Sequence, residues 1–93
     1  MPEIQVSRSD VEESRSRFHV QVVDDDGVTS HDVTLSRADL ERLGARYPTS
    51  EAFIEACFTF LLEREPKGSI LPSFDVSQIS TYFPEFDTVI ARH

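Results

Sequence analysis

The sequence is short of three kinds of residue, and each shortage excludes a class of protein. One cysteine among 93 residues rules out an internal disulfide and favours a reducing compartment, so we expect a cytoplasmic protein. The three glycines are scattered, so no glycine-rich loop is available to cradle a phosphate. Nine Lys and Arg against 17 Asp and Glu give a net charge of −8, which disfavours nucleic acid and anionic membranes as partners.

Long apolar runs are also missing. Residues 1–10 lack such a run, so we expect no signal peptide. The most apolar segment, residues 50–65 (SEAFIEACFTFLLERE), would be about 24 Å long as a helix, which is too short and too charged at its ends to cross a membrane. The sequence does contain 39% hydrophobic residues and seven Phe. This composition predicts a folded chain with one modest core in a single domain, residues 1–93.

The segment 50–65 predicts a central helix around which the other elements pack. Its polar residues recur at every fourth position and form one narrow stripe: Glu51, Glu55, Thr59 and Glu63. The other positions are almost all apolar, which indicates a helix that is buried on more than one side. Thr49 or Ser50 can cap its start, and Pro66 stops it.

Alternation of apolar and polar residues predicts three strands, at about residues 4–9, 16–23 and 28–35. Asp26-Gly27 is a favoured hairpin pair, and a turn there would place Val22 opposite His31 and Val20 opposite Val33. This register gathers the apolar residues of both strands on one face. The weaker pattern at 4–9 predicts a third antiparallel strand.

Three further helices are predicted, at about residues 37–43, 76–83 and 84–91. Ser36 can cap the first of them, and Asp75 and Gln78 have the spacing of a capping box at the start of the second. The expected fold is therefore α+β: an antiparallel hairpin or three-stranded meander, followed by three to four helices packed around the central helix.

A candidate partner-binding corner follows the central helix. The charges of Arg64 and Lys67 come directly before three large apolar residues, and charges around apolar anchors resemble an interface hot spot. The candidate residues are Arg64, Lys67, Ile70, Leu71 and Phe74. The alternative is a solvated helix end whose apolar neighbours simply close the core.

Metal-binding patterns are weak. The acidic turn at 24–27 fails as a calcium loop because Val22 and Val33 would occupy its first and twelfth ligand positions. His19, His31 and His93 are the only histidines, and His19 and His31 should lie on opposite faces of the hairpin, so we expect no convergent set of zinc ligands. We therefore expect no metal and no cofactor.

Catalytic patterns are equally weak. Cys57 and His31 could serve as nucleophile and base, but no oxyanion-hole motif accompanies them. A mid-helix cysteine is more often a small buried apolar residue.

The order of strands and helices also suggests a ribbon-helix-helix repressor, which reads DNA. However, Arg8, Arg15 and Arg17 are the only local basic cluster, so specific DNA binding is not favoured. We expect neither an enzyme nor a DNA-binding protein.

The stretches FHVQVVDDDGVTSHDVTLSRADLERL, FLLEREPKGSIL and SFDVSQISTYFPEF resemble a class of small bacterial proteins without an assigned activity, cofactor or catalytic residue. The leading hypothesis is a non-enzymatic cytoplasmic binding or regulatory module that acts through protein–protein contact, including pairing of two copies through a strand edge. One alternative is an acidic, antitoxin-like or nucleic-acid-mimicking neutraliser of a basic partner. Another is a small enzyme that depends on Cys57.

Overall fold

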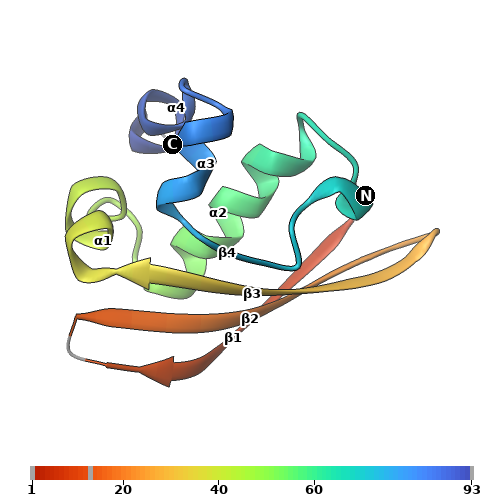
Figure 1. Cartoon of the computed structure of the whole chain (residues 1–93), viewed down its shortest axis with the longest axis horizontal. Helices are drawn as coiled ribbons and strands as arrows, with labels where there is room; N and C mark the ends of the chain where they lie inside the picture. The colour runs from red at the N-terminus through yellow and green to blue at the C-terminus, as the bar shows by residue number, and fades with distance from the viewer. Residues whose placement is uncertain (1, 13, 93) are drawn as a thin grey trace.

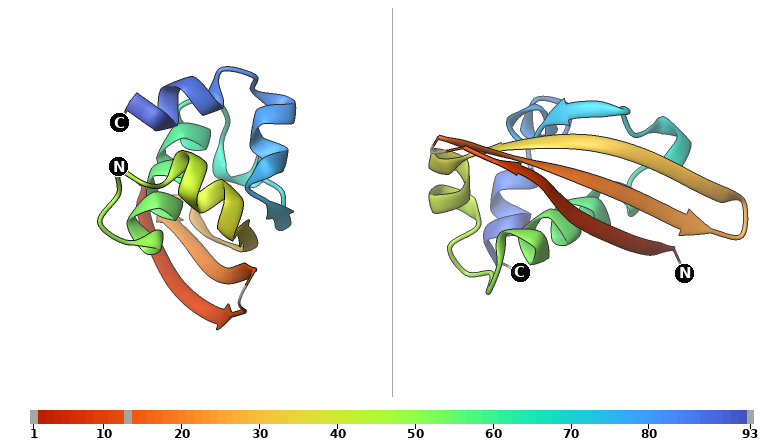
Figure 2. Two further views of the ribbon diagram at one scale, coloured as in Figure 1. Left: turned by 90° about the vertical axis from the view of Figure 1, so that its left-hand side faces the viewer. Right: turned by 90° about the horizontal axis from the view of Figure 1, so that it is seen from below.

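The computed structural model describes residues 2–12 and 14–92 and shows a four-stranded mixed sheet with helices on one of its faces (Figure 1). The strands lie in the order β1 (Glu3–Val11), β2 (Arg15–Asp24), β3 (Gly27–Ser36) and β4 (Ser73–Asp75). The first three form an antiparallel meander, and β4 runs parallel to β3. Figure 2 shows from two sides that the helices leave the other face of the sheet uncovered. The predicted α+β class is confirmed.

The hairpin between β2 and β3 turns one residue earlier than the sequence predicted. Asp24 pairs with Gly27, so residues 25–26 form the loop. A favoured turn at 26–27 would need a positive φ at Asp26, whereas Gly27 is the only residue in the described part of the chain with a positive φ, at +129°. The Asp24 carboxylate also accepts a hydrogen bond from Asp26 N at 2.9 Å, which favours the earlier turn.

The predicted strand pairs are therefore wrong, although the predicted faces are right. Val22 lies opposite Thr29 instead of His31, and Val20 lies opposite His31 instead of Val33. A displacement by two residues keeps every side chain on its original face, because the side-chain period of a strand is two. The face toward the helices is buried at Phe18, Val20, Val22, His31, Val33 and Leu35.

The central helix α2 (Ser50–Leu62) is buried on more than one side, as the sequence predicted. The ring of Phe58 packs against His31 of β3 and Phe74 of β4, with ring centroids 5.4 and 5.9 Å away. The ring of Phe60 contacts Phe86 instead, at 5.0 Å. The polar stripe lies outward, with Glu51 half-buried and Glu55, Thr59 and Glu63 exposed.

α2 ends at Leu62, before the predicted end at Glu65. The amides of Arg64 and Glu65 both bond to Leu61 O, at 3.0 and 2.9 Å, so the chain tightens into a turn. Pro66 explains this end, because proline disfavours a helical conformation in the residue before it. A short 3-10 helix, η1 (Lys67–Ser69), follows.

The other helices are α1 (Arg37–Leu43), α3 (Ser77–Tyr82) and α4 (Phe86–Arg92). Ser36 Oγ caps α1 by accepting a hydrogen bond from Asp39 N at 3.1 Å. The predicted capping box forms before α3: the Asp75 carboxylate accepts from Ser77 N at 3.0 Å, and Gln78 Oε1 accepts from Asp75 N at 2.8 Å. This box fixes where α3 leaves the sheet, and so positions one side of the groove described below.

Candidate functional site

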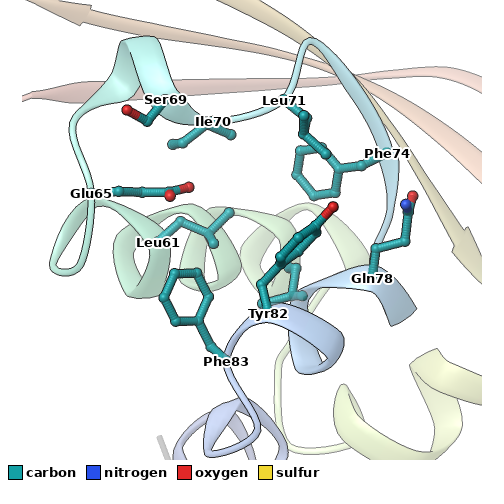
Figure 3. A pocket seen from close by; sticks show the side chains of 10 residues that line it. Leu61, Glu65, Ser69, Ile70, Leu71, Phe74, Gln78, Tyr82 and Phe83 are labelled. Atoms are coloured by element: carbon teal, nitrogen blue, oxygen red, sulfur yellow. The ribbon is translucent and has the colours of Figure 1, made fainter.

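A groove of about 320 Å³ opens between the C-terminal end of α2, the segment after it, and α3 (Figure 3). Its floor is apolar and buried, and consists of Leu61, Ile70, Phe74 and Ile79. Its rim is also largely apolar, and consists of Leu71, Tyr82 and Phe83. Three polar residues complete the lining: Glu65, Ser69 and Gln78.

The rim exposes two large side chains. Leu71 is 42% exposed and Tyr82 is 64% exposed, and both line the groove. Val28, at 57%, is the third large apolar side chain that is exposed in the described part of the chain, and it lies in the β2–β3 hairpin. Two of these three exposed apolar side chains therefore border one concavity, as is typical of a binding surface.

Backbone hydrogen bonds hold one wall of the groove against the sheet. Asp32 N donates to Pro72 O at 2.8 Å, and Val76 N donates to Thr34 O at 2.9 Å. His31 adds a side-chain tether, because its Nδ1 lies 2.8 Å from Leu71 O. A carbonyl oxygen only accepts, so Nδ1 carries the hydrogen of this bond. The segment that carries Leu71 is thus held by β3.

The candidate partner-binding residues divide into two groups. Ile70, Leu71 and Phe74 all line the groove, the first and last as buried floor residues and Leu71 at the rim. Arg64 and Lys67 do not line it. The two cations pair with carboxylates outside the groove, so the charged half of the predicted corner is separate from its apolar half.

Arg64 stacks on the ring of Phe60, with its guanidinium carbon 3.6 Å from the ring centroid, and its Nε lies 3.1 Å from Glu85 Oε2. Its guanidinium helps to lower the pKa of Glu85, after the backbone hydrogen bond of Glu85 itself. Lys67 Nζ lies 2.8 Å from Asp24 Oδ1, and its hydrogen bond lowers the pKa of that carboxyl. Both cations therefore cross-link elements of the fold.

Sequence reasoning missed the side of the groove that α2 and α3 supply. Glu65 lies just beyond α2, Gln78 and Tyr82 lie on α3, and Phe83 follows it. Gln78 and Tyr82 are four residues apart, which places them on one face of a helix. That spacing was a readable signal, but it did not indicate which neighbour the face would meet.

Cys57 and His31 do not form an activated pair. Cys57 is 1% exposed, and burial raises the pKa of its thiol well above the usual range, so the nucleophilic thiolate is disfavoured. His31 Nδ1 contacts Leu71 O, and its Nε2 lies 2.9 Å from Thr29 Oγ1. Both ring nitrogens are therefore occupied in holding the fold together.

The histidines are placed as the sequence predicted where the structure describes them. His31 is buried under the helices, whereas His19 lies on the opposite face, with its Nδ1 3.2 Å from Asp32 Oδ1. His93 lies outside the described residues. Within residues 2–12 and 14–92, no three His, Cys, Asp or Glu side chains are grouped so that they could hold a metal ion.

The arginines considered for DNA binding lie beside acidic side chains. Arg8 is paired with Glu51 at 2.9 Å and donates to Ser50 Oγ at 2.8 Å, which ties β1 to the start of α2. Arg15 and Arg17 line a shallow hollow of about 30 Å³ together with acidic side chains.

The described helices include none that is long and apolar enough to cross a membrane. Comparisons of the chain with protein-family models, with curated proteins and with solved structures find no match.

Proposed function

We propose that this protein is a non-catalytic binding module that holds a segment of a partner protein in the groove between α2 and α3. The observation that carries the proposal is the joint exposure of Leu71 and Tyr82 over a buried apolar floor. Tyrosine is enriched among the residues that dominate binding energy, and such residues surround pockets that receive an anchor from the partner.

The size of the groove supports a side-chain anchor as its occupant. A volume of about 320 Å³ is at the lower end of the roughly 300–1,000 Å³ that is usual for sites enclosing whole small molecules. One or two bulky apolar side chains of a partner would fill it. The rest of the partner segment would then pass over Leu71 and Tyr82, whose exposed surface would be buried on binding.

The proposal is tested by selecting binding peptides from a random display library and titrating one selected peptide against variants of the full chain. Leu71→Asp and Tyr82→Ala should each weaken binding by about tenfold or more, because each removes apolar contact at the rim. Val28→Asp is the matched control, since the exposed fraction of Val28 lies between those of Leu71 and Tyr82 but Val28 does not line the groove. It should leave the affinity unchanged.

Two outcomes contradict the proposal. One is a library that yields no peptide binding at micromolar concentration. The other is a set of selected peptides whose affinity survives both rim substitutions. Circular dichroism of each variant checks that the fold is intact, which is expected because both substituted side chains lie at the surface.

The acidic charge favours a second function, as a neutraliser of a basic partner protein. The net charge is −8, and five of the basic side chains are already paired with carboxylates within the chain. Binding of this kind weakens steeply with added salt, whereas burial of an apolar anchor depends on salt only weakly. A neutraliser should therefore lose its affinity steeply with salt and keep it in Tyr82→Ala, whereas a groove partner should lose affinity in Tyr82→Ala and keep most of it at high salt.

We also propose that the module works in the cytoplasm, where its single cysteine remains reduced.

We propose in addition that two copies of the chain can pair through β1. This strand lies at the edge of the sheet over nine residues. Its pairing with β2 is irregular between Arg8 and Asp10, so residues 3–7 offer the regular part of the edge. Sedimentation analysis that finds only monomer at micromolar concentration and above contradicts this pairing.

A further inference from the structure

Glu65 is the one charged residue among those that line the groove in the described part of the chain. Figure 3 shows its carboxylate reaching from the end of α2 to a position between Leu61 and Ile70. The side chain is half-buried, so the apolar floor and the carboxylate face the same space. An occupant of the groove would therefore meet both.

The neighbouring cations do not neutralise this carboxylate. Arg64 extends to Glu85 and the ring of Phe60, and Lys67 extends to Asp24. The ion pairs formed by the described residues do not include Glu65. Its negative charge is thus available to a bound molecule, in a setting where the floor reduces screening by water.

The other polar groups at the groove are uncharged. Gln78 Oε1 is already engaged, because it accepts the hydrogen bond from Asp75 N that caps α3. Ser69 and Tyr82 contribute hydroxyl groups, which can donate or accept. Selectivity between charged occupants therefore depends on Glu65 and on the net charge of the chain, −8.

We infer that the partner segment carries a bulky apolar side chain beside a lysine or arginine, with the apolar group on the floor and the cation at Glu65. This inference rests on the proposed function and specifies the chemistry of the partner. The net charge of −8 adds to the preference for a basic segment, because it attracts cations over a longer range. It also disfavours a second copy of this acidic chain as the occupant.

An apolar anion, such as a fatty carboxylate, is the opposite case. It would satisfy the floor equally well, but its charge would lie beside Glu65 and like charges repel. The two chemistries are therefore separated by charge alone, at constant apolar shape. This permits a test with small probes that does not require the natural partner.

The probes are 4-phenylbutylamine, 4-phenylbutan-1-ol and 5-phenylpentanoate, which share a phenylbutyl group and differ in charge. Each is titrated into the isotopically labelled full chain at pH 7 and low salt, and amide shifts in residues 61–83 report binding. The amine should bind about three- to tenfold more tightly than the alcohol, and the carboxylate more weakly than both. Added salt should reduce the preference.

Glu65→Gln should bring the affinities of amine and alcohol to within about twofold of each other, because the shape of the side chain is kept and its charge is lost. Glu55→Gln is the matched control, since Glu55 is exposed on the outer stripe of α2 and does not line the groove. It should retain the preference for the amine.

The outcomes separate this inference from the proposed function. If amine and alcohol bind the wild-type chain equally, or if Glu65→Gln keeps the preference, the inferred chemistry is wrong while the groove remains a binding site. If none of the three probes shifts the amides of the groove, the groove does not bind apolar groups and both proposals are wrong.

Discussion

Replacing Gly27 with alanine should destabilise the protein through its backbone conformation alone. Gly27 has φ +129°, in a region that residues with a side chain rarely adopt. Apart from Gly27 and its two chain neighbours, no heavy atom lies within 4 Å of the position that a Cβ would take there, so a clash with the rest of the protein does not contribute. Holding alanine in such a conformation costs about 1–3 kcal/mol, which is a large part of the stability of a small domain.

Gly68→Ala is the matched control for this substitution. A Cβ at Gly68 would also meet no atom within 4 Å, and the residue lies outside the positive-φ region. Alanine reduces the freedom of the unfolded chain equally in both variants, so the difference between them isolates the cost of φ. We expect Gly68→Ala to be neutral, or to stabilise by up to about 1 kcal/mol.

The assay is urea denaturation monitored by far-ultraviolet circular dichroism. The dependence of the unfolding free energy on urea concentration is compared among wild type and the two variants. A free energy of unfolding that is lower by about 1–3 kcal/mol for Gly27→Ala than for Gly68→Ala is the expected result. Equal stability of the two variants would refute the reasoning. It would show that residues 25–26 can adjust so that residue 27 no longer needs a positive φ, at no cost in free energy.

Two further predictions concern buried and capping groups. Because Cys57 is 1% exposed and burial raises the pKa of its thiol, the native protein should react with a thiol reagent at least about 100-fold more slowly than the urea-unfolded chain. Rapid labelling of native protein would instead support a reactive cysteine. Burial acts to raise the pKa of Asp75, but hydrogen bonds from Thr34 and Ser77 hold it below its usual value. Ser77→Ala removes the 2.7 Å bond from Ser77 Oγ, so the pKa of Asp75 should rise and stability at pH 7 should fall by about 1 kcal/mol or less. A lowered carboxyl pKa stabilises the fold above the unfolded value of about 3.9, so this difference should disappear as the pH falls through the folded value. Carbon NMR titration and denaturation at both ends of this range check it.

The local features of the fold were predictable from short stretches of sequence. The capping box of Asp75 and Gln78 and the cap of Ser36 each depend on residues within a few positions, and the structure contains them. The buried face of the hairpin followed from alternation. The turn lies one residue before the Asp26-Gly27 pair that the dipeptide preference predicts, because the Asp24 carboxylate accepts a hydrogen bond from Asp26 N.

The non-local features were not predictable by the same means. β4 is three residues long and pairs with β3 across some 40 positions of sequence, so its pattern is too short to be read. The sequence suggests that Lys67 is available to a partner, but in the structure it pairs with Asp24, far away in sequence. Glu65 and Tyr82 became groove residues only because α3 packs beside the end of α2. Such placements depend on the packing of whole elements.

The parallel pairing of β4 makes the groove depend on two distant parts of the chain. The groove needs residues 32–34 joined to 73–75, with α3 following. In a chain cut between residues 63 and 72, these two parts would be held together by non-covalent contacts alone. Occupancy by a partner would in turn hold the two distant parts together, since a ligand of the native state raises its stability. The proposed binding should therefore depend on a chain that is uncut between residues 63 and 72.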